Sequence, residues 1–243
     1  MHLKAFWGIF LVILLTACAT KEKTYRVGVD PSWYPLRISG KESYIYAFSN
    51  ELLEAIGQEE RIHFVRINRT WDNLMDGLEK GHYEAMLSSM VPHIFLEKRF
   101  SFSNLFLQTG PVLVLPAGRE ESLLKDMKGK EIAVDSLSTE VALLKQFPEV
   151  TIHYYPSIPL GFDELLSGNY DGLTIGNLQA RSYLRDLYRG RVVIATEPLS
   201  EEGLRLITLK GEKGFLVERF NQGLEKLRKS GKLEQLMKKW EIQ

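Results

Sequence analysis

The sequence has one cysteine and no net charge, and each feature excludes a class of protein. A lone cysteine, Cys18, cannot build a disulfide framework within the chain or a CxxC zinc site. The 31 Lys and Arg residues are balanced by 31 Asp and Glu residues. Nucleic-acid binding needs a basic surface that displaces counterions from phosphates, so we expect no nucleic-acid partner.

The sequence also lacks the common catalytic motifs. It has no HExxH, GxGxxG or P-loop pattern, and no Ser-His-Asp order of a catalytic triad. We therefore expect a protein that is not an enzyme and that holds no metal or cofactor. His93, which follows Pro92, is the one histidine that merits a test as a catalytic group, although a lone histidine is more often structural.

The N-terminal residues are typical of a lipoprotein signal peptide. The apolar run Ala5–Leu15 has 11 residues, whereas a membrane-spanning helix needs about 20. It leads into Leu15-Thr16-Ala17-Cys18, which resembles the lipobox of bacterial lipoproteins. We expect residues 1–17 to be removed, Cys18 to carry acyl chains such as palmitate, and residues 18–24 to form a tether to the membrane. The alternative is a buried free cysteine.

The rest of the chain alternates between strand and helix patterns. Strands are predicted at Tyr25–Val29, Ile62–Ile67 and Ala85–Ser88, with helices at Ser49–Ile56 and from Thr70 to Lys80. Such alternation predicts an α/β fold with largely parallel sheets covered by helices. Near the C-terminus, Gly214–Lys229 and Lys232–Trp240 are predicted to be helical.

Two segments of the sequence repeat in the same order. Gly81–Met86 (GHYEAM) is echoed by Gly168–Leu173 (GNYDGL), and Val27–Asp30 by Ile132–Asp135. Two echoes in one order predict two similar lobes rather than one sheet. Between them, the apolar stretch 108–116 and residues 192–195 are expected to cross from one lobe to the other and to form a hinge.

Seven motifs follow one another along the chain: VGVDPSWYP (27–35), AFSNELLEAIG (47–57), LEKGHYEAMLSS (78–89), FSFSNLF (100–106), LKDMKGKEIAV (124–134), LLSGNYDGL (165–173) and LRKSGKLEQLMKKW (227–240). Together they resemble type II periplasmic binding proteins. The closer resemblance is to bacterial solute-binding protein family 3, the polar amino-acid-binding branch that serves ABC importers. It implies a two-lobed Venus-flytrap fold, with residues 25–111 and 196–243 in lobe 1 and residues 112–195 in lobe 2.

The resemblance implies aromatic residues on both sides of the ligand. Trp33 falls where the family places an aromatic that covers the ligand side chain, and Trp71 falls where it places a second. Two indoles would supply dispersion and cation–π attraction. For Trp71, packing of its own helix is the competing interpretation. Asp30 is a further candidate ligand-binding residue, although it precedes Pro31 and could simply cap a turn.

Hydroxyl side chains at strand ends are the other candidate ligand-binding residues. Ser88 and Ser89 lie where the family holds a ligand carboxylate at the end of a parallel strand, and two turn serines would have the same sequence. In lobe 2, Ser138 and Thr139 open a predicted helix. They could contact an anion or cap that helix.

Two positions depart from the family pattern. Leu96 stands where the family carries an arginine that binds the ligand's α-carboxylate, and Gly176 where it carries an aspartate for the α-ammonium. A charge-assisted hydrogen bond contributes about 1.5–3 kcal/mol, so leucine is no substitute. The ligand is therefore expected to be atypical, or Arg99 or Arg69 to supply the missing cation.

The sequence as a whole predicts a lipid-anchored, monomeric solute-binding protein of an ABC importer. It would capture an amino acid or a related small polar solute between its lobes and deliver it to a permease at the outer face of a bacterial membrane. Two alternatives stay open: a periplasmic dehydratase-like enzyme of the same fold, and a sensor or docking protein without transport function.

Overall fold

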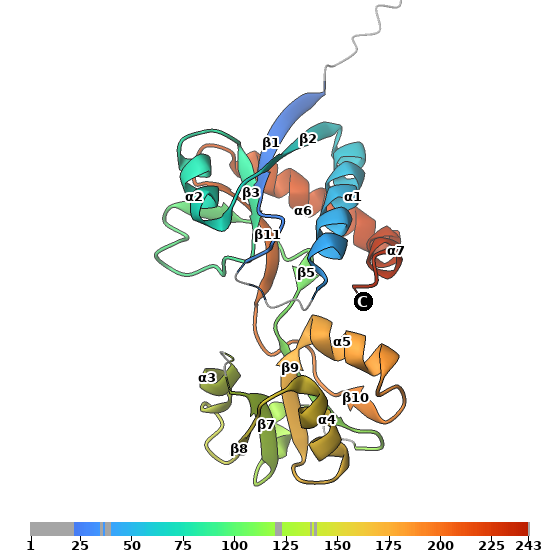
Figure 1. Cartoon of the computed structure of the whole chain (residues 1–243). Helices are drawn as coiled ribbons and strands as arrows, with labels where there is room; N and C mark the ends of the chain where they lie inside the picture. The colour runs from blue at the N-terminus through green and yellow to red at the C-terminus, as the bar shows by residue number, and fades with distance from the viewer. Residues whose placement is uncertain are drawn as a thin grey trace, which may run out of the picture.

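The computed structural model describes residues 22–34, 36, 40–119, 123–136, 138 and 140–242. Cys18 and the predicted signal peptide lie outside these residues, and so does Thr139. The described chain forms two lobes, each built on its own sheet (Figure 1).

The first lobe contains a six-stranded sheet in the order β2-β1-β3-β11-β4, with β5 paired to β11. Strands β1, β2 and β3 are parallel, and β11 runs antiparallel to both β3 and β4. The strands are β1 (Lys23–Val29), β2 (Ile62–Asn68), β3 (Ala85–Ser88), β4 (Phe100–Phe102), β5 (Leu107–Gln108) and β11 (Gly203–Leu209). The helices of this lobe are α1 (Glu42–Glu60), α2 (Trp71–Glu79), α6 (Gly214–Lys229) and α7 (Lys232–Lys239).

The second lobe contains a five-stranded sheet in the order β10-β6-β9-β7-β8. Strands β7, β8 and β9 are parallel, and β6 runs antiparallel to β9. The strands are β6 (Pro111–Pro116), β7 (Glu131–Asp135), β8 (Thr151–Tyr155), β9 (Gly172–Gly176) and β10 (Val192–Ile194). The helices are the 3₁₀ helix η1 (Leu124–Met127), α3 (Glu140–Leu144), α4 (Ile158–Leu166) and α5 (Asn177–Asp186).

The two lobes repeat one topology, as the echoes in the sequence predicted. Strand β1 lies between β2 and β3, and β7 lies between β8 and β9 in the same way. Gly81 follows α2 and Gly168 follows α4, and both have the left-handed backbone conformation that ends a helix before the next strand. In both lobes, a glycine at the same place therefore ends the helix and leads the chain into the next strand.

Helix α1 begins seven residues earlier than the sequence analysis predicted, at Glu42 instead of Ser49. Its buried side chains follow helical spacing from Ile45 through Phe48 and Leu52 to Ile56. The tyrosines at 44 and 46 obscure this spacing in the sequence, but the buried apolar stripe extends back to Ile45, which lies between them. Sheet and helices bury separate apolar clusters on the two faces of each sheet.

The segments that cross between the lobes are shorter than predicted. The stretch 108–116 was expected to be a crossover, but Pro111–Pro116 is strand β6, and Val192–Ile194 is strand β10 paired with it. Strand β6 is buried along nearly its whole length, whereas in the edge strand β10 only Val192 is buried. The chain crosses at 109–110 and again at 195–202, and the backbone N–H groups of Thr109 and Gly110 both donate to the Glu202 carbonyl. A Cβ at Gly110 would lie 2.7 Å from the Ser200 carbonyl oxygen, so only glycine permits this approach.

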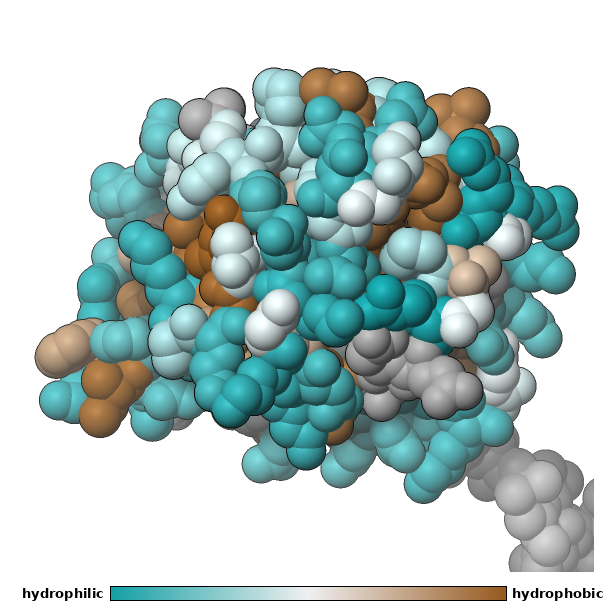
Figure 2. All heavy atoms as spheres, turned by 90° about the horizontal axis from the view of Figure 1, so that it is seen from below, coloured by the Kyte–Doolittle hydropathy of each residue, from teal (hydrophilic) through white to brown (hydrophobic). Residues whose placement is uncertain are grey.

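The surface seen from below, where the second lobe is nearest the viewer, is mainly hydrophilic (Figure 2). Hydrophobic side chains on this face lie in small, separate groups. Exposed apolar residues of the second lobe include Tyr154 and Leu187. Scattered exposed apolar groups of this size are normal for a globular protein.

A buried carboxylate joins α1 to α6. The Glu60 side chain is 3% exposed, with Lys226 Nζ 2.7 Å from Oε1 and Arg219 Nη1 3.3 Å from Oε2. Both cations are about half exposed, so the carboxylate rather than the cations is desolvated. These two ion pairs connect α1 and α6, the helices that pack most closely on this face of the first sheet.

We expect Glu60→Gln to lower the free energy of unfolding by about 1–2 kcal/mol, because two charge-assisted hydrogen bonds lose their anion. Urea denaturation measures the change. Glu225→Gln, which removes the half-exposed partner of Lys229 on the same helix, is the matched control and should cost less than about 0.5 kcal/mol. Equal losses in the two variants would contradict the prediction.

Candidate ligand-binding site

The carboxyl ends of four strands meet at one edge of the first sheet. β1, β2 and β3 are parallel, and β4 runs with them because β11 is antiparallel to β3 and β4. Residues that follow these strands therefore lie along this edge, among them Asp30, Arg69, Ser88 and Ser103. Since β11 begins at this edge directly after the crossover, the edge is directed toward the second lobe.

The second sheet is arranged in the same way. β6 starts directly after the other crossover, and its first residue, Pro111, pairs with Gly176 at the end of β9. The carboxyl ends of β7 and β9 therefore also lie beside the crossovers. Backbone N–H groups at the carboxyl ends of parallel strands are available to ligands, and such edges commonly form binding sites. The two facing edges are the candidate site.

Asp30 closes the turn after β1. Its Oδ1 accepts hydrogen bonds from the Ser32 backbone N–H at 2.9 Å and from the Ser32 hydroxyl at 2.8 Å. The Trp33 N–H donates to the Asp30 carbonyl at 3.0 Å. This is the turn-capping arrangement, and it fixes the loop that carries Trp33 and Tyr34. A direct contact between Asp30 and a ligand stays a prediction.

Trp33 lies in the core of the first lobe. Its backbone is left-handed, with φ 57°, which is uncommon for a bulky residue. The side chain is 3% exposed, packs in the cluster that includes Phe48 and Leu52, and donates from Nε1 to the Glu42 carbonyl at 3.2 Å. In this structure the indole therefore stabilises the loop from beneath. The role of covering a ligand, which the sequence assigned to it, stays a prediction.

The exposed aromatic surface at this edge comes from Tyr34 and Trp71. Tyr34 is 60% exposed, and its ring meets the edge of the Trp71 ring at a centroid distance of 5.9 Å. Trp71 is the first residue of α2 and is partly buried against the cluster on that face of the sheet. The sequence analysis did not single out Tyr34. Its position beside Trp33 in the same Pro-flanked loop was the available signal.

The predicted serines lie at the two edges, and the hydroxyl oxygens of Ser88 and Ser138 already have hydrogen-bond partners. Ser88 ends β3, is buried, and accepts the Met90 N–H on its hydroxyl oxygen at 3.2 Å, while Ser89 is half-buried. In the second lobe, Ser138 donates its hydroxyl to the Asp135 carbonyl at 2.8 Å and closes the turn after β7. These residues are placed at the facing edges, whereas ligand contact by any of them stays a prediction.

The two arginines considered as replacements for the missing one differ in their surroundings. Arg99 is ion-paired with Glu79, and its guanidinium lies 5.3 Å from the centre of the Phe100 ring. Arg69 is exposed at the carboxyl edge, and its Nη1 donates to the Asn68 carbonyl at 3.0 Å. Leu96 packs against the apolar cluster beneath α2. Arg69 follows the carboxyl end of β2, whereas Arg99 precedes β4 and so lies at the opposite edge of the sheet.

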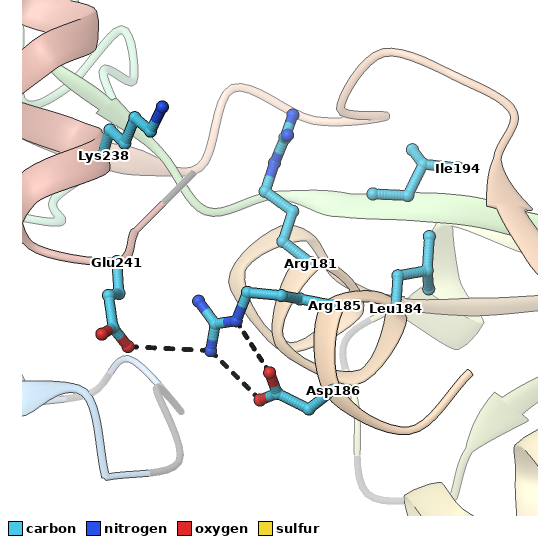
Figure 3. A pocket seen from close by; sticks show the side chains of 7 residues that line it. All are labelled: Arg181, Leu184, Arg185, Asp186, Ile194, Lys238 and Glu241. Atoms are coloured by element: carbon cyan, nitrogen blue, oxygen red, sulfur yellow. Dashed lines mark hydrogen bonds and ion pairs between the residues drawn. The ribbon is translucent and has the colours of Figure 1, made fainter. Parts of the chain in front are cut away.

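A cavity lies between α5 and the end of α7, away from the two sheet edges, with a volume of about 770 Å³ (Figure 3). In it, Arg185 of the second lobe makes an ion pair with Asp186 at 2.8 Å and approaches Glu241 of the first lobe at 3.8 Å. The hydrogen bond from Arg185 lowers the pKa of Asp186. The lining residues are Arg181, Leu184, Arg185, Asp186, Ile194, Lys238 and Glu241.

This cavity is lined by charges that pair across the lobes rather than by the predicted site residues. Lys41 at the start of α1 also approaches Glu241, at 3.7 Å. Helix α5 contributes Leu178 to the apolar cluster of the first lobe, and Asn177 donates to the Gln108 carbonyl at 3.3 Å. The cavity therefore belongs to the contact between the lobes.

Comparison with known proteins places the chain in one family. Residues 25–243 match the family model of bacterial extracellular solute-binding proteins, family 3. The chain belongs to this family, and its two open α/β sheets have the type II periplasmic binding protein fold.

The chain is similar to curated amino-acid-binding proteins of ABC transporters along nearly its full length. It is 23% identical to the ABC transporter arginine-binding protein 1 of Escherichia coli, covering 95% of this chain and 96% of that protein. It is also 23% identical to the ABC transporter glutamine-binding protein of Bacillus subtilis, and the match covers 97% of this chain and 95% of that protein.

A solved structure has the same fold. The L-cystine solute receptor of Neisseria gonorrhoeae in its unliganded open conformation matches with a TM-score of 0.70 and 19% identity, covering 90% of this chain and 93% of that one.

Two further observations concern the described ranges alone. No helix in them combines the length and the apolar character needed to cross a bilayer. Nor do three or more His, Cys, Asp or Glu side chains in these ranges form a group able to hold a metal ion.

The different burial of the two tryptophans generates a prediction. We expect Trp33→Ala to lower the free energy of unfolding by about 3–5 kcal/mol, because a fully packed aromatic side chain is removed. Trp71→Ala, the matched control, should cost about 1–2 kcal/mol, since its indole is partly exposed. Chemical denaturation followed by circular dichroism measures both, and a larger loss for Trp71→Ala would contradict the assignment of Trp33 to the core.

Proposed function

We propose that this protein is the lipid-anchored solute receptor of an ABC importer, and that it captures an amino acid or a close relative between its lobes. Its membership of family 3 is the observation that carries the proposal. The relatives that bind arginine and glutamine support an amino-acid ligand. The two carboxyl edges beside the crossovers support a site between the lobes.

Capture by this fold is a shift in population. A ligand that contacts both edges only when the lobes are closed stabilises the closed state by its difference in affinity for the two states. The closed receptor, which we propose acts as a monomer, then docks on the permease. It binds its ligand without chemical conversion.

The side chains at the first edge suit a ligand with a flat or cationic side chain. Tyr34 and Trp71 present adjoining rings, and a cation over an aromatic face gains about 0.5–2 kcal/mol. The absence of the usual α-amino-acid clamp at Leu96 and Gly176 supports a ligand bound differently from that of ordinary family members.

A thermal-shift screen tests the proposal. We expect at least one solute among amino acids, dipeptides and polyamines to raise the melting temperature of the chain from residue 19 onward, because ligand binding to the folded state stabilises it. If none of the solutes does so, the proposed transport role is wrong.

For a solute that binds, Tyr34→Ala should weaken binding by about 1–2 kcal/mol. Tyr154→Ala, an exposed tyrosine of the second lobe's edge strand β8, is the control and should leave the affinity unchanged.

The anchor is tested separately. In cells fed a labelled palmitate analogue, the wild-type chain should incorporate label and sediment with membranes, because acyl chains contribute about 0.8 kcal/mol per buried CH₂. Cys18→Ala should incorporate no label. Label in the Cys18→Ala chain, or none in the wild type, would refute anchoring at this residue.

A further inference from the structure

We propose that Arg205, a buried arginine on β11, binds the carboxylate of the ligand in place of the arginine that is missing at position 96. This inference rests on the proposed function and specifies it further: the ligand carries a carboxylate, and the group that receives it comes from the strand that follows the crossover. Arg205 was not among the site residues predicted from the sequence.

Arg205 lies at the carboxyl edge of the first sheet. It pairs with Ser88, the last residue of β3, and residues directly opposite each other on adjacent antiparallel strands project to the same face. Ile207 and Met86, the next pair along the two strands, belong to the apolar cluster beneath α2. Arg205, Ser88 and the partly buried Leu96 therefore share one face of the sheet.

The guanidinium of Arg205 is buried and incompletely hydrogen-bonded. The residue is 7% exposed. Its Nη2 donates to the Glu201 carbonyl at 3.0 Å, and its Nη1 reaches the Ser103 carbonyl at 3.4 Å. Among the described residues, its Nε is buried and has no hydrogen-bond partner. A guanidinium has five N–H donors in a planar fork, so part of this fork is available to an acceptor.

The charge of Arg205 is poorly compensated. Its ion-pair partner is Glu201, whose Oε2 lies 3.4 Å from Nη2 and whose side chain is 81% exposed. Burial lowers the pKa of Arg205, which agrees with a cation held away from water. A buried cation whose one anionic partner is largely exposed to solvent is only partly compensated, and a ligand carboxylate that displaces Glu201 would compensate it more fully.

Ser88 can complete the same receptor. Its hydroxyl oxygen accepts the Met90 N–H at 3.2 Å, and a hydroxyl that accepts one hydrogen bond still has its own hydrogen to donate. A carboxylate at this edge could therefore take one hydrogen bond from Ser88 and others from the free side of the Arg205 fork. Arg99, by contrast, is mostly exposed and already paired with Glu79.

Paired ligands that differ only in the carboxylate test the assignment. L-Arginine is compared with agmatine, its decarboxylated form, and L-glutamine with 4-aminobutanamide, by thermal shift and calorimetry on the chain from residue 19 onward. For the wild type we expect the amino acid of at least one pair to bind about 10- to 100-fold more tightly than its decarboxylated partner, which corresponds to a charge-assisted hydrogen bond.

Variants assign that preference to a residue. Arg205→Met should reduce it to about twofold or less while leaving binding of the decarboxylated ligand unchanged. Arg205→Lys should retain part of it, because lysine keeps the charge but loses the fork. Glu201→Gln should increase the affinity for the amino acid several-fold, since the carboxylate that competes for Arg205 is removed. Arg99→Met, a control outside the proposed site, should retain the full preference.

The outcomes separate this inference from the proposed function. If none of the four compounds binds the wild type, this inference is wrong, whereas the proposed function is decided by the wider thermal-shift screen. If an amino acid binds and Arg205→Met retains the preference for the carboxylate, the assignment of Arg205 is wrong and the proposed function stands. If Arg205→Met does not fold by circular dichroism, Arg205→Lys and Glu201→Gln decide. Unchanged carboxylate preference in both would overturn the assignment.

Discussion

The antiparallel insertion of β11 between β3 and β4 is the constraint on which the architecture depends. The strand belongs to the last part of the chain, yet it completes the sheet begun by the first part. Its direction makes β3 and β4 run the same way, so their carboxyl ends lie at the edge where β11 enters from the crossover. Strand β6 has the equivalent position beside β9 in the second lobe. Both crossovers therefore attach at carboxyl edges, and the two edges must face each other.

The lobes are joined by more than the crossovers. Helix α5 belongs to the second lobe, yet Leu178 is buried in the apolar cluster of the first, and Arg185 approaches Glu241 near the C-terminus (Figure 3). Apolar contacts of this kind resist changes in salt, whereas an ion pair near 3.8 Å in a solvated cavity is weak and screened. Relative motion of the lobes has to preserve the contact of Leu178 or exchange it for another, which restricts the paths that closure can take.

The candidate site combines a rigid base with an exposed rim. Trp33, although expected to cover the ligand, supports the loop after β1 from within the core, and the adjacent Tyr34 presents its ring to solvent against Trp71. Ser88 and Arg205 lie deeper on the same edge. We therefore propose that shape selection by the rim and charge selection by the base reside in different segments of the chain.

Local signals in the sequence determined the elements of this fold. Helix α6 spans Gly214–Lys229 and β3 spans Ala85–Ser88, both as predicted, because the period of apolar residues and the turn residues at the ends are properties of neighbouring positions. The glycines at 81 and 168, which begin the two repeated segments, both adopt the left-handed conformation. The doubled topology followed from the repeated motifs.

Only the tertiary structure decided which side chains face the site. The sequence predicted an aromatic in the loop after β1, but the backbone conformation at residue 33 determined that Trp33 is buried and Tyr34 exposed. Arg205 has a local partner in Glu201, but its place at the site depends on distant segments, because its second carbonyl partner at Ser103 is 102 residues away and its strand neighbour Ser88 is further still. Burial and hydrogen bonding between distant segments depend on how the strands pair, and pairing is a property of the folded chain.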